Sequence, residues 1–275
     1  MEGKNFRLER FLSRSKKLVI AAIDHGAFMG PIEGLENLKT ACAHLSNADA
    51  ILMSPGIAEH IISQFTEFNG PQLIIRLSWN SNYCCQWNYN KSFHRPLLTA
   101  ANALAKGADL FLASLALNTG NEQTDADNVE IFSDYVQQAH GLGIPIIGEY
   151  YPVHAGKMLP TELHENIRIG CRIVAELGAD MIKTFYTGSR FHEIVESTPI
   201  PIFVLGAKKT PTETEALRLA GEAAAVGARG IIFGRNIVQS SSPARFIKAV
   251  RAVMNDGITP EEALQTYEPD EILVA

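Results

Sequence analysis

The chain has 275 residues, a length that suits a single α/β barrel of about 250 residues. Apolar residues make up 46% of it and charged residues 20%, which are globular proportions, so disorder is excluded for the chain as a whole. The formal net charge of −6 argues against nucleic acid as the main partner, because phosphate backbones bind basic surfaces.

Short apolar runs recur along the chain. Several of them directly follow a few small residues of the kind that end a helix. The clearest examples of this recurring phrase, a Gly-Ala-Asp motif before an apolar run, are Gly107-Ala108-Asp109 and Gly178-Ala179-Asp180. A helix ends well on a left-handed glycine, and a strand buried on both faces is continuously apolar, so the phrase predicts a helix followed by a buried strand. The predicted strands are 18–23, 51–53, 73–77, 110–113, 146–148, 181–183, 200–205 and 231–233.

Helix starts fit between these runs. Thr210 is the predicted cap of one helix, with Pro211 at the first helical position and Glu213 three residues after the cap. Ser242-Pro243 opens the last barrel helix in the same way.

Strands and helices alternate with short connections, which predicts a parallel sheet with right-handed crossovers. An open sheet could be built from such units, but eight evenly spaced units favour a closed (β/α)8 TIM barrel. We expect one barrel domain over residues 1–275, with a short N-terminal helix. A short C-terminal extension is expected after about residue 256, with a helix over 260–265.

No apolar run approaches the roughly 18 residues of a membrane span, and residues 1–7 lack the apolar centre of a signal peptide. The four cysteines form no C-x-x-C pair that would indicate zinc or redox chemistry. We therefore expect a cytoplasmic protein with reduced cysteines and no membrane partner.

The carboxyl ends of barrel strands carry the active site, and Lys183 stands at one of them. An ammonium group after an apolar run is costly unless it is paired or functional. The free amine of a desolvated lysine can add to a ketone and form an imine. Tyr151 and Asp24 end other strands and could transfer the protons. The structural alternatives are a solvent-facing or carboxylate-paired lysine, a packing tyrosine and a capping aspartate.

The loops after the last two predicted strands have the composition of a phosphate-binding site, here called the phosphate cradle. Gly206 and Gly234 allow close backbone approach and Arg235 adds positive charge, although glycines also serve merely to turn a chain. No G-x-G-x-x-G opens a helix after a strand, so no nicotinamide site is predicted. Only His25 ends a strand and His154 lies just past another, so no metal site is predicted either.

Four segments together resemble the archaeal-type class I fructose-bisphosphate aldolases and their relatives: 23–26, Tyr151-Pro152, 175–184 and 233–237. The resemblance covers residues 15 to 255, approximately. It implies a Schiff base on Lys183, with Tyr151 as general acid/base and Asp24 assisting imine formation. It also implies no cofactor, a phosphorylated ketone or sugar as substrate, and a homo-oligomer, commonly a decamer. The phosphate-binding positions that it implies are Gly206, Ala207, Gly234 and Arg235.

The chain departs from the family pattern in ways that bear on specificity. Val153-His154 stands where the family has Arg-Gly, and Ala207-Lys208-Lys209 stands where it has Gly-Pro-Lys. Glu149 replaces an apolar residue of many members. The residues expected to affect specificity are His25, Glu149, His154, Lys208 and Lys209. The aromatic-rich segment 79–94 is interpreted either as a specificity lid or as an ordered loop.

The sequence therefore predicts a Schiff-base aldolase acting on a substrate such as fructose 1,6-bisphosphate or dihydroxyacetone phosphate. One alternative keeps the lysine but transfers a group differently, as in the autoinducer-2-phosphate aldolase/thiolase or the deoxyheptulosonate-type synthase. A requirement for coenzyme A would identify the thiolase. Another alternative is a barrel that binds a sugar phosphate without turnover, which would bind its ligand but form no imine.

Overall fold

The computed structural model describes residues 2–67, 69–89 and 91–267. Eight parallel strands close into a barrel, in the circular order β1-β2-β3-β6-β7-β8-β9-β10, so the predicted (β/α)8 fold is confirmed. Each predicted run overlaps one of these strands, and 18–23, 73–77 and 200–205 extend one or two residues beyond theirs. The barrel strands are β1 (Leu18–Ala22), β2 (Ala50–Met53), β3 (Gln72–Arg76), β6 (Leu110–Leu115), β7 (Ile146–Tyr150), β8 (Met181–Phe185), β9 (Ile202–Leu205) and β10 (Gly230–Phe233).

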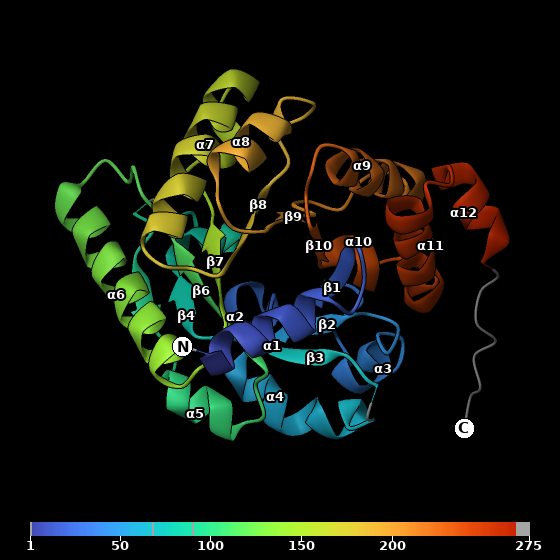
Figure 1. Ribbon diagram of the computed structural model, residues 1–275, viewed down its shortest axis with the longest axis horizontal. Helices are drawn as coiled ribbons and strands as arrows, with labels where there is room; N and C mark the ends of the chain where they lie inside the picture. Colours follow the sequence, from blue (N-terminus) through green and yellow to red (C-terminus); the bar gives the residue numbers. More distant parts are fainter. Residues whose placement is uncertain (1, 68, 90, 268–275) are drawn as a thin grey trace.

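Helices surround the barrel (Figure 1). No helix among the described residues is long and apolar enough to cross a membrane. The helices outside the barrel are α3 (Leu38–Ala43), α4 (Pro55–Ile61), α5 (Ala100–Ala105), α6 (Glu122–Gly141), α7 (Pro160–Glu176), α8 (Phe191–Ser197), α9 (Glu213–Ala225) and α11 (Pro243–Asp256). Short helices follow two of the strands, α2 (Gly26–Met29) after β1 and α10 (Arg235–Val238) after β10.

The predicted helix starts are correct in one case and shifted in the other. Helix α11 begins at Pro243, as expected. Helix α9 is capped by Thr212, whose hydroxyl accepts from the Glu215 amide, and not by Thr210. The Thr210 hydroxyl instead donates to the Thr212 carbonyl, and the Thr210 amide donates to the buried side chain of Asn236. The helix expected near the C-terminus is α12 (Pro260–Thr266), and residues from 268 onward lie outside the described ones.

Three aspartates of the recurring phrase fasten the amino ends of the barrel strands. Each precedes one strand and accepts a hydrogen bond from the first amides of the strand before it. Asp49 accepts from Val19 of β1 at 2.8 Å, and Asp109 accepts from Leu73 of β3 at 2.8 Å. Asp180 accepts from Ile146 of β7 at 3.0 Å. The sequence repeat thus has a physical role, because charged acceptors make strong bonds to backbone amides.

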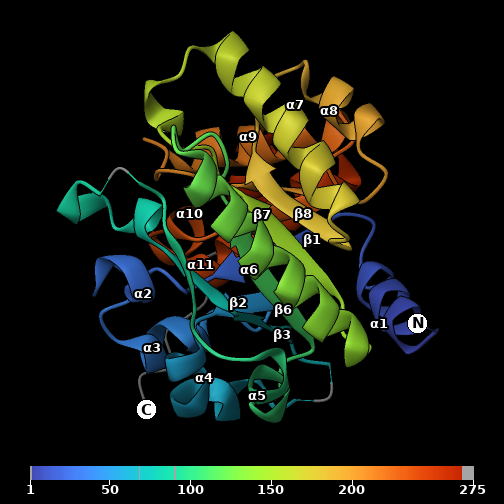
Figure 2. The same cartoon turned by 90° about the vertical axis from the view of Figure 1, so that its left-hand side faces the viewer.

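The barrel interior is filled by alternate residues of the strands, including Ile20, Leu52, Ile74, Leu112 and Ile232. Such layered packing is expected for a barrel of this size. Helix α1 (Glu2–Leu12) lies against the amino-terminal end of the barrel, as Figure 2 shows. Its Phe11 is fully buried in the same cluster, so this side chain closes the floor of the barrel.

Replacing Phe11 with alanine should therefore lower the free energy of unfolding by about 3–5 kcal/mol, because a buried aromatic ring is lost and a cavity is left. Urea unfolding followed by circular dichroism measures this. Phe6 of the same helix is 68% exposed, so Phe6→Ala is the control and should change stability by less than about 0.5 kcal/mol. Equal effects of the two substitutions would contradict the placement of α1.

The segment after β3 builds a separate hairpin of β4 (Ser78–Asn80) and β5 (His94–Pro96). Two 3₁₀ turns lie between the strands, η2 (Ser81–Tyr83) and η3 (Cys85–Trp87). The buried His94 ring contacts the Asn80 side chain at 2.5 Å and ties the hairpin together. In Figure 2 this insertion projects at the end of the barrel away from α1.

Candidate active site

Strand register brings Lys183 and Glu149 together. Glu149 on β7 is paired in register with Lys183 on β8, so both side chains point into the same layer of the barrel. Lys183 Nζ lies 2.6 Å from Glu149 Oε1. Lys183 is 6% exposed and Glu149 is 3% exposed. The predicted strand-end lysine is thus buried and paired with a carboxylate.

Arg76 at the end of β3 joins this pair to Asp24. Its Nε donates to Asp24 at 2.6 Å, and a terminal nitrogen donates to Glu149 Oε2 at 2.8 Å. The Ser114 hydroxyl, from β6, contacts both Arg76 and Glu149 at 2.8 Å. Tyr83 of the insertion donates to Glu149 Oε2 at 2.9 Å. Two cations and two anions therefore form one buried network at the carboxyl end of the barrel.

The network fixes the charge state of its members. Burial by itself would raise the pKa of Glu149, but Arg76 and Lys183 outweigh burial and hold it well below the usual range. The pKa of Asp24 is lowered in the same way, against burial, chiefly by Arg76. Burial would lower the pKa of Arg76, but the two carboxylates raise it. Both acids are consequently ionised at neutral pH.

Tyr151 follows β7 and lies in a row of aromatic rings across the barrel mouth. Its ring meets Tyr83 edge-on at 5.0 Å between centroids and Phe185 at 4.6 Å. Phe28 of α2 extends the row, 4.9 Å from Tyr83. Burial raises the pKa of Tyr151 to about 12, so its phenol carries a proton at neutral pH and can act as a proton donor.

The loops after β9 and β10 approach each other closely. Arg235 donates from its guanidinium to the Ala207 carbonyl at 2.5 Å, and Ala207 has a left-handed backbone with φ 49°. Asn236 donates to the Gly206 carbonyl at 3.2 Å. A Cβ at Gly234 would lie 2.1 Å from the His25 ring, so a larger residue there would have to displace that ring. Burial lowers the pKa of His25 and leaves its ring neutral at pH 7.

These groups surround one open pocket, with an empty volume of about 660 Å³. The pocket brings together nine of the residues predicted from the sequence, which come from five strand ends. These residues are Asp24, His25, Glu149, Tyr151, Lys183, Gly206, Ala207, Gly234 and Arg235.

Three predicted specificity residues do not line this pocket. His154 is exposed and caps a 3₁₀ turn in the left-handed conformation. Lys209 donates to the Gln239 carbonyl and borders a different surface depression. Lys208 is exposed. Their positions in the sequence suggested proximity, but each lies past the point where its loop turns outward.

Sequence reasoning missed Arg76 and Ser114, which belong to the ion network, and it gave no individual role to Tyr83 and Cys85 of the aromatic-rich segment, which line the pocket. Arg76 carried a usable signal, because a charged residue at the end of an apolar strand needs buried partners. The insertion brings Tyr83 and Cys85 to the pocket, and its function as a specificity lid or as an ordered loop stays a prediction. Among the described residues no group of three or more His, Cys, Asp or Glu could hold a metal ion.

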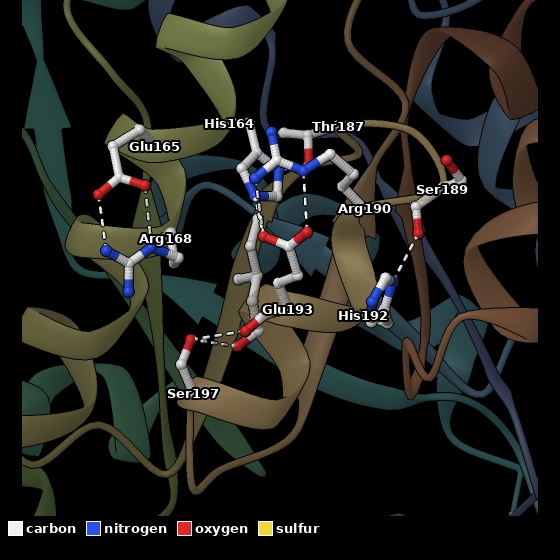
Figure 3. Close-up of polar contacts among 10 residues, drawn as sticks. His164, Glu165, Arg168, Thr187, Ser189, Arg190, His192, Glu193 and Ser197 are labelled. Atoms are coloured by element: carbon white, nitrogen blue, oxygen red, sulfur yellow. Dashed lines mark hydrogen bonds and ion pairs between the residues drawn. The ribbon is translucent and has the colours of Figure 1, made fainter.

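A second polar cluster, outside the pocket, holds the loop that follows β8 (Figure 3). The buried His164 of α7 contacts the Thr187 hydroxyl at 2.9 Å and Glu193 of α8 at 3.3 Å. Arg190 pairs with Glu193 through two hydrogen bonds. These contacts connect α7, α8 and the β8 loop, and so stabilise the backbone just beyond Lys183.

Comparisons with known proteins agree with this arrangement. The DeoC/LacD family of aldolases matches residues 18–240. An uncharacterized aldolase of Saccharolobus solfataricus is 30% identical over 275 residues, which cover 96% of this chain and 99% of the relative. The 3-hydroxy-5-phosphonooxypentane-2,4-dione thiolase of Escherichia coli is 30% identical over 267 residues, covering 96% and 87%.

Solved structures show the same fold. An archaeal fructose 1,6-bisphosphate aldolase superposes with a TM-score of 0.77 at 24% identity, covering 93% of this chain and all of the other. The fructose-bisphosphate aldolase from Slackia heliotrinireducens has a TM-score of 0.78 at 18% identity, covering 100% of this chain and 92% of the other. With its family match over most of the barrel, the chain belongs to the DeoC/LacD family of aldolases and is a carbon–carbon lyase.

Proposed function

We propose that the protein is a class I aldolase in which Lys183 forms a Schiff base with a phosphorylated ketone. The observation that carries the proposal is the position of Lys183. It is buried at the carboxyl end of β8, it faces the pocket, and its amine lies 2.6 Å from a carboxylate. Once it has lost its proton, a lysine amine at this position can add to the carbonyl group of a ketone bound in the pocket.

In this proposal the residues around Lys183 have separate roles. One donates a proton, and another stabilises the charge that develops on the nitrogen. The lysine amine adds to the ketone, and Tyr151 donates the proton with which water leaves. Glu149 lies beside the nitrogen that becomes positively charged in the iminium ion, so its fixed negative charge stabilises that ion. Asp24 acts through Arg76, which it holds in place against Glu149.

The cradle formed by the loops after β9 and β10 is the proposed phosphate site. Gly206, Ala207 and Gly234 border the pocket together with Arg235, and their backbone amides and the guanidinium are the proposed donors to the phosphate. Binding energy at a phosphate remote from the carbonyl would position the reacting carbon above Lys183. The name of the Escherichia coli relative includes a phosphonooxy group beside ketone groups, which supports this substrate class.

A second candidate is the thiolase reaction, favoured by that same relative. It would use the same lysine and would require coenzyme A. Turnover of a phosphorylated ketone that depends on added coenzyme A would select it over aldol cleavage. A transaldol synthase or a fructose 1,6-bisphosphate aldolase would need no coenzyme A. The expected homo-oligomer and cytoplasmic location stay predictions.

The proposal is tested by incubating the protein with dihydroxyacetone phosphate, reducing with borohydride and measuring intact and peptide masses. We expect one adduct per chain, on Lys183. The Lys183→Met variant should give no adduct. Lys17, a partly buried lysine that donates to the Ala228 carbonyl, provides a matched control, so Lys17→Met should be labelled like the unaltered protein.

Two results would contradict the proposal. One is the absence of an adduct with dihydroxyacetone phosphate and with a panel of phosphorylated ketoses that includes fructose 1,6-bisphosphate. The other is labelling that survives in Lys183→Met. Binding of a sugar phosphate without any imine would instead favour a barrel that only binds its ligand.

A further inference from the structure

The aldolase pocket has two chemically different sides. Eight strands in a circle place β3 opposite β9 and β6 opposite β10. The phosphate cradle follows β9 and β10, and the insertion lies between β3 and β6. Tyr83 and Cys85 of the insertion therefore face Gly206 and Gly234 across the barrel mouth, with Lys183 from β8 beside the cradle.

The insertion, α2 and the residue after β7 together contribute an aromatic and apolar wall to the pocket. Phe28, Tyr83 and Tyr151 stand edge-to-face in a row, with centroids 4.9 and 5.0 Å apart. Met29 and Cys85 line the pocket next to them. The Tyr83 hydroxyl is already used as a donor to Glu149, so this ring offers mainly its carbon surface to a bound molecule.

The basic side chains of the pocket already have partners within the protein. Among the described residues that line it, the basic side chains other than His25 are Arg76, Lys183 and Arg235. Arg76 is bound by Asp24, Glu149 and Ser114, and its guanidinium lies over the rings of Phe28 and Tyr83. Lys183 is paired with Glu149.

Arg235 is on the cradle side, where it donates to the Ala207 carbonyl. The basic residues of the insertion itself, Lys91 and Arg95, lie over the Phe93 ring. Lys91 and Phe93 line a separate surface depression, outside the pocket that holds Lys183. A single phosphate can therefore be neutralised at the cradle, but a second one on the insertion side would face rings and two buried carboxylates.

We propose that the carbonyl compound that reacts with the Lys183-bound ketone is an uncharged aldehyde with an apolar or aromatic group. A bisphosphorylated ketose is then a poor substrate, because its second phosphate would be desolvated without a cation. The inference rests on the proposed Schiff-base function and names the acceptor for it. The acceptor's apolar group contacts Phe28, Tyr83 and Tyr151.

The reaction balances without an oxidant or a cofactor. Lys183 and the ketone lose water and give the iminium ion. The Tyr151 phenolate, left after Tyr151 protonated the departing water, takes the α-proton, and the iminium ion becomes an enamine. The electron pair of the enamine forms the new carbon–carbon bond to the aldehyde carbon. The aldehyde oxygen takes up a proton and becomes a hydroxyl group. Water then adds to the regenerated iminium ion and releases the hydroxyketone phosphate and the lysine amine.

The test compares acceptors with one donor. The protein and dihydroxyacetone phosphate are mixed with glyceraldehyde 3-phosphate, butanal or phenylacetaldehyde, and products are quantified by mass spectrometry. Cleavage of fructose 1,6-bisphosphate is measured in parallel. We expect kcat/KM for at least one uncharged aldehyde to exceed that for glyceraldehyde 3-phosphate by about tenfold or more.

A variant that adds a cation on the insertion side sharpens the test. Cys85→Lys should raise kcat/KM for glyceraldehyde 3-phosphate relative to the uncharged aldehydes by about tenfold, because it supplies the missing counter-charge. Cys85→Gln adds length without charge and should not change this ratio.

The inference is overturned if the phosphorylated acceptor is used as well as or better than every uncharged aldehyde, or if no uncharged aldehyde reacts. Borohydride trapping of dihydroxyacetone phosphate on the same protein tests the Schiff base separately from the acceptor. If the ketone is trapped but the phosphorylated acceptor is preferred, only the inference about the acceptor is contradicted. Failure to trap any phosphorylated ketone overturns the proposed function, and this inference with it.

Discussion

Replacing Arg76 with leucine should lower the free energy of unfolding by about 3–5 kcal/mol, because it leaves buried carboxylates without their main counter-ion. Arg76 is 2% exposed and binds both Asp24 and Glu149. Leucine also removes the guanidinium from over the rings of Phe28 and Tyr83, so the loss reports the charge, its hydrogen bonds and these ring contacts. Urea unfolding curves of the two proteins give the difference.

The control is an arginine in an exposed ion pair. Arg218 lies 3.2 Å from Glu261 on the surface, and Arg218→Leu should cost less than about 1 kcal/mol. The double variant Arg76→Leu/Glu149→Gln should be more stable than the sum of its single effects, with a coupling of about 0.5–3 kcal/mol. A loss below about 1 kcal/mol in Arg76→Leu would show that water, and not Arg76, compensates the two acids.

Replacing Glu149 with glutamine should slow turnover on the order of 10²–10³-fold, the range found when one electrostatic contact to a developing charge is removed. Glutamine has nearly the same shape and can still accept from Tyr83. It lacks the negative charge 2.6 Å from the nitrogen that becomes the iminium ion. The rate of borohydride trapping and kcat for the best ketone should both fall.

Glu165→Gln serves as the control, because Glu165 pairs with Arg168 on the outer surface of α7, away from the pocket. It should leave both rates within about twofold, as surface substitutions usually have small effects. A trapping rate in Glu149→Gln that matches the unaltered protein would assign Glu149 to structure alone.

The sequence predicted the barrel because its signals are local. Each strand is a short apolar run, and the Gly-Ala-Asp phrase marks the helix end before it, as at Asp109 and Asp180. The strand ends also predicted Lys183, Tyr151 and Asp24, since parallel strands bring their carboxyl ends to one edge. The structure places these three side chains around one pocket.

The partners of these residues could not be predicted in the same way. The contact between Glu149 and Lys183 depends on the register of β7 against β8, which the spacing of residues along the chain does not give. Tyr83 reaches Glu149 only because the insertion folds back over the mouth. His154 and Lys209 were placed at the mouth by sequence position, but the turn of each loop directs them elsewhere.

The three aspartates that accept backbone hydrogen bonds at the amino-terminal end of the barrel have a consequence for engineering. Asp49, Asp109 and Asp180 hold the amino ends of β1, β3 and β7, while the residues proposed to react lie at the opposite ends of the strands. A directed-evolution library confined to the insertion and the mouth loops would leave all three of these hydrogen bonds intact. Selection for a new acceptor and selection for heat resistance can then be run on separate sets of codons and combined afterwards.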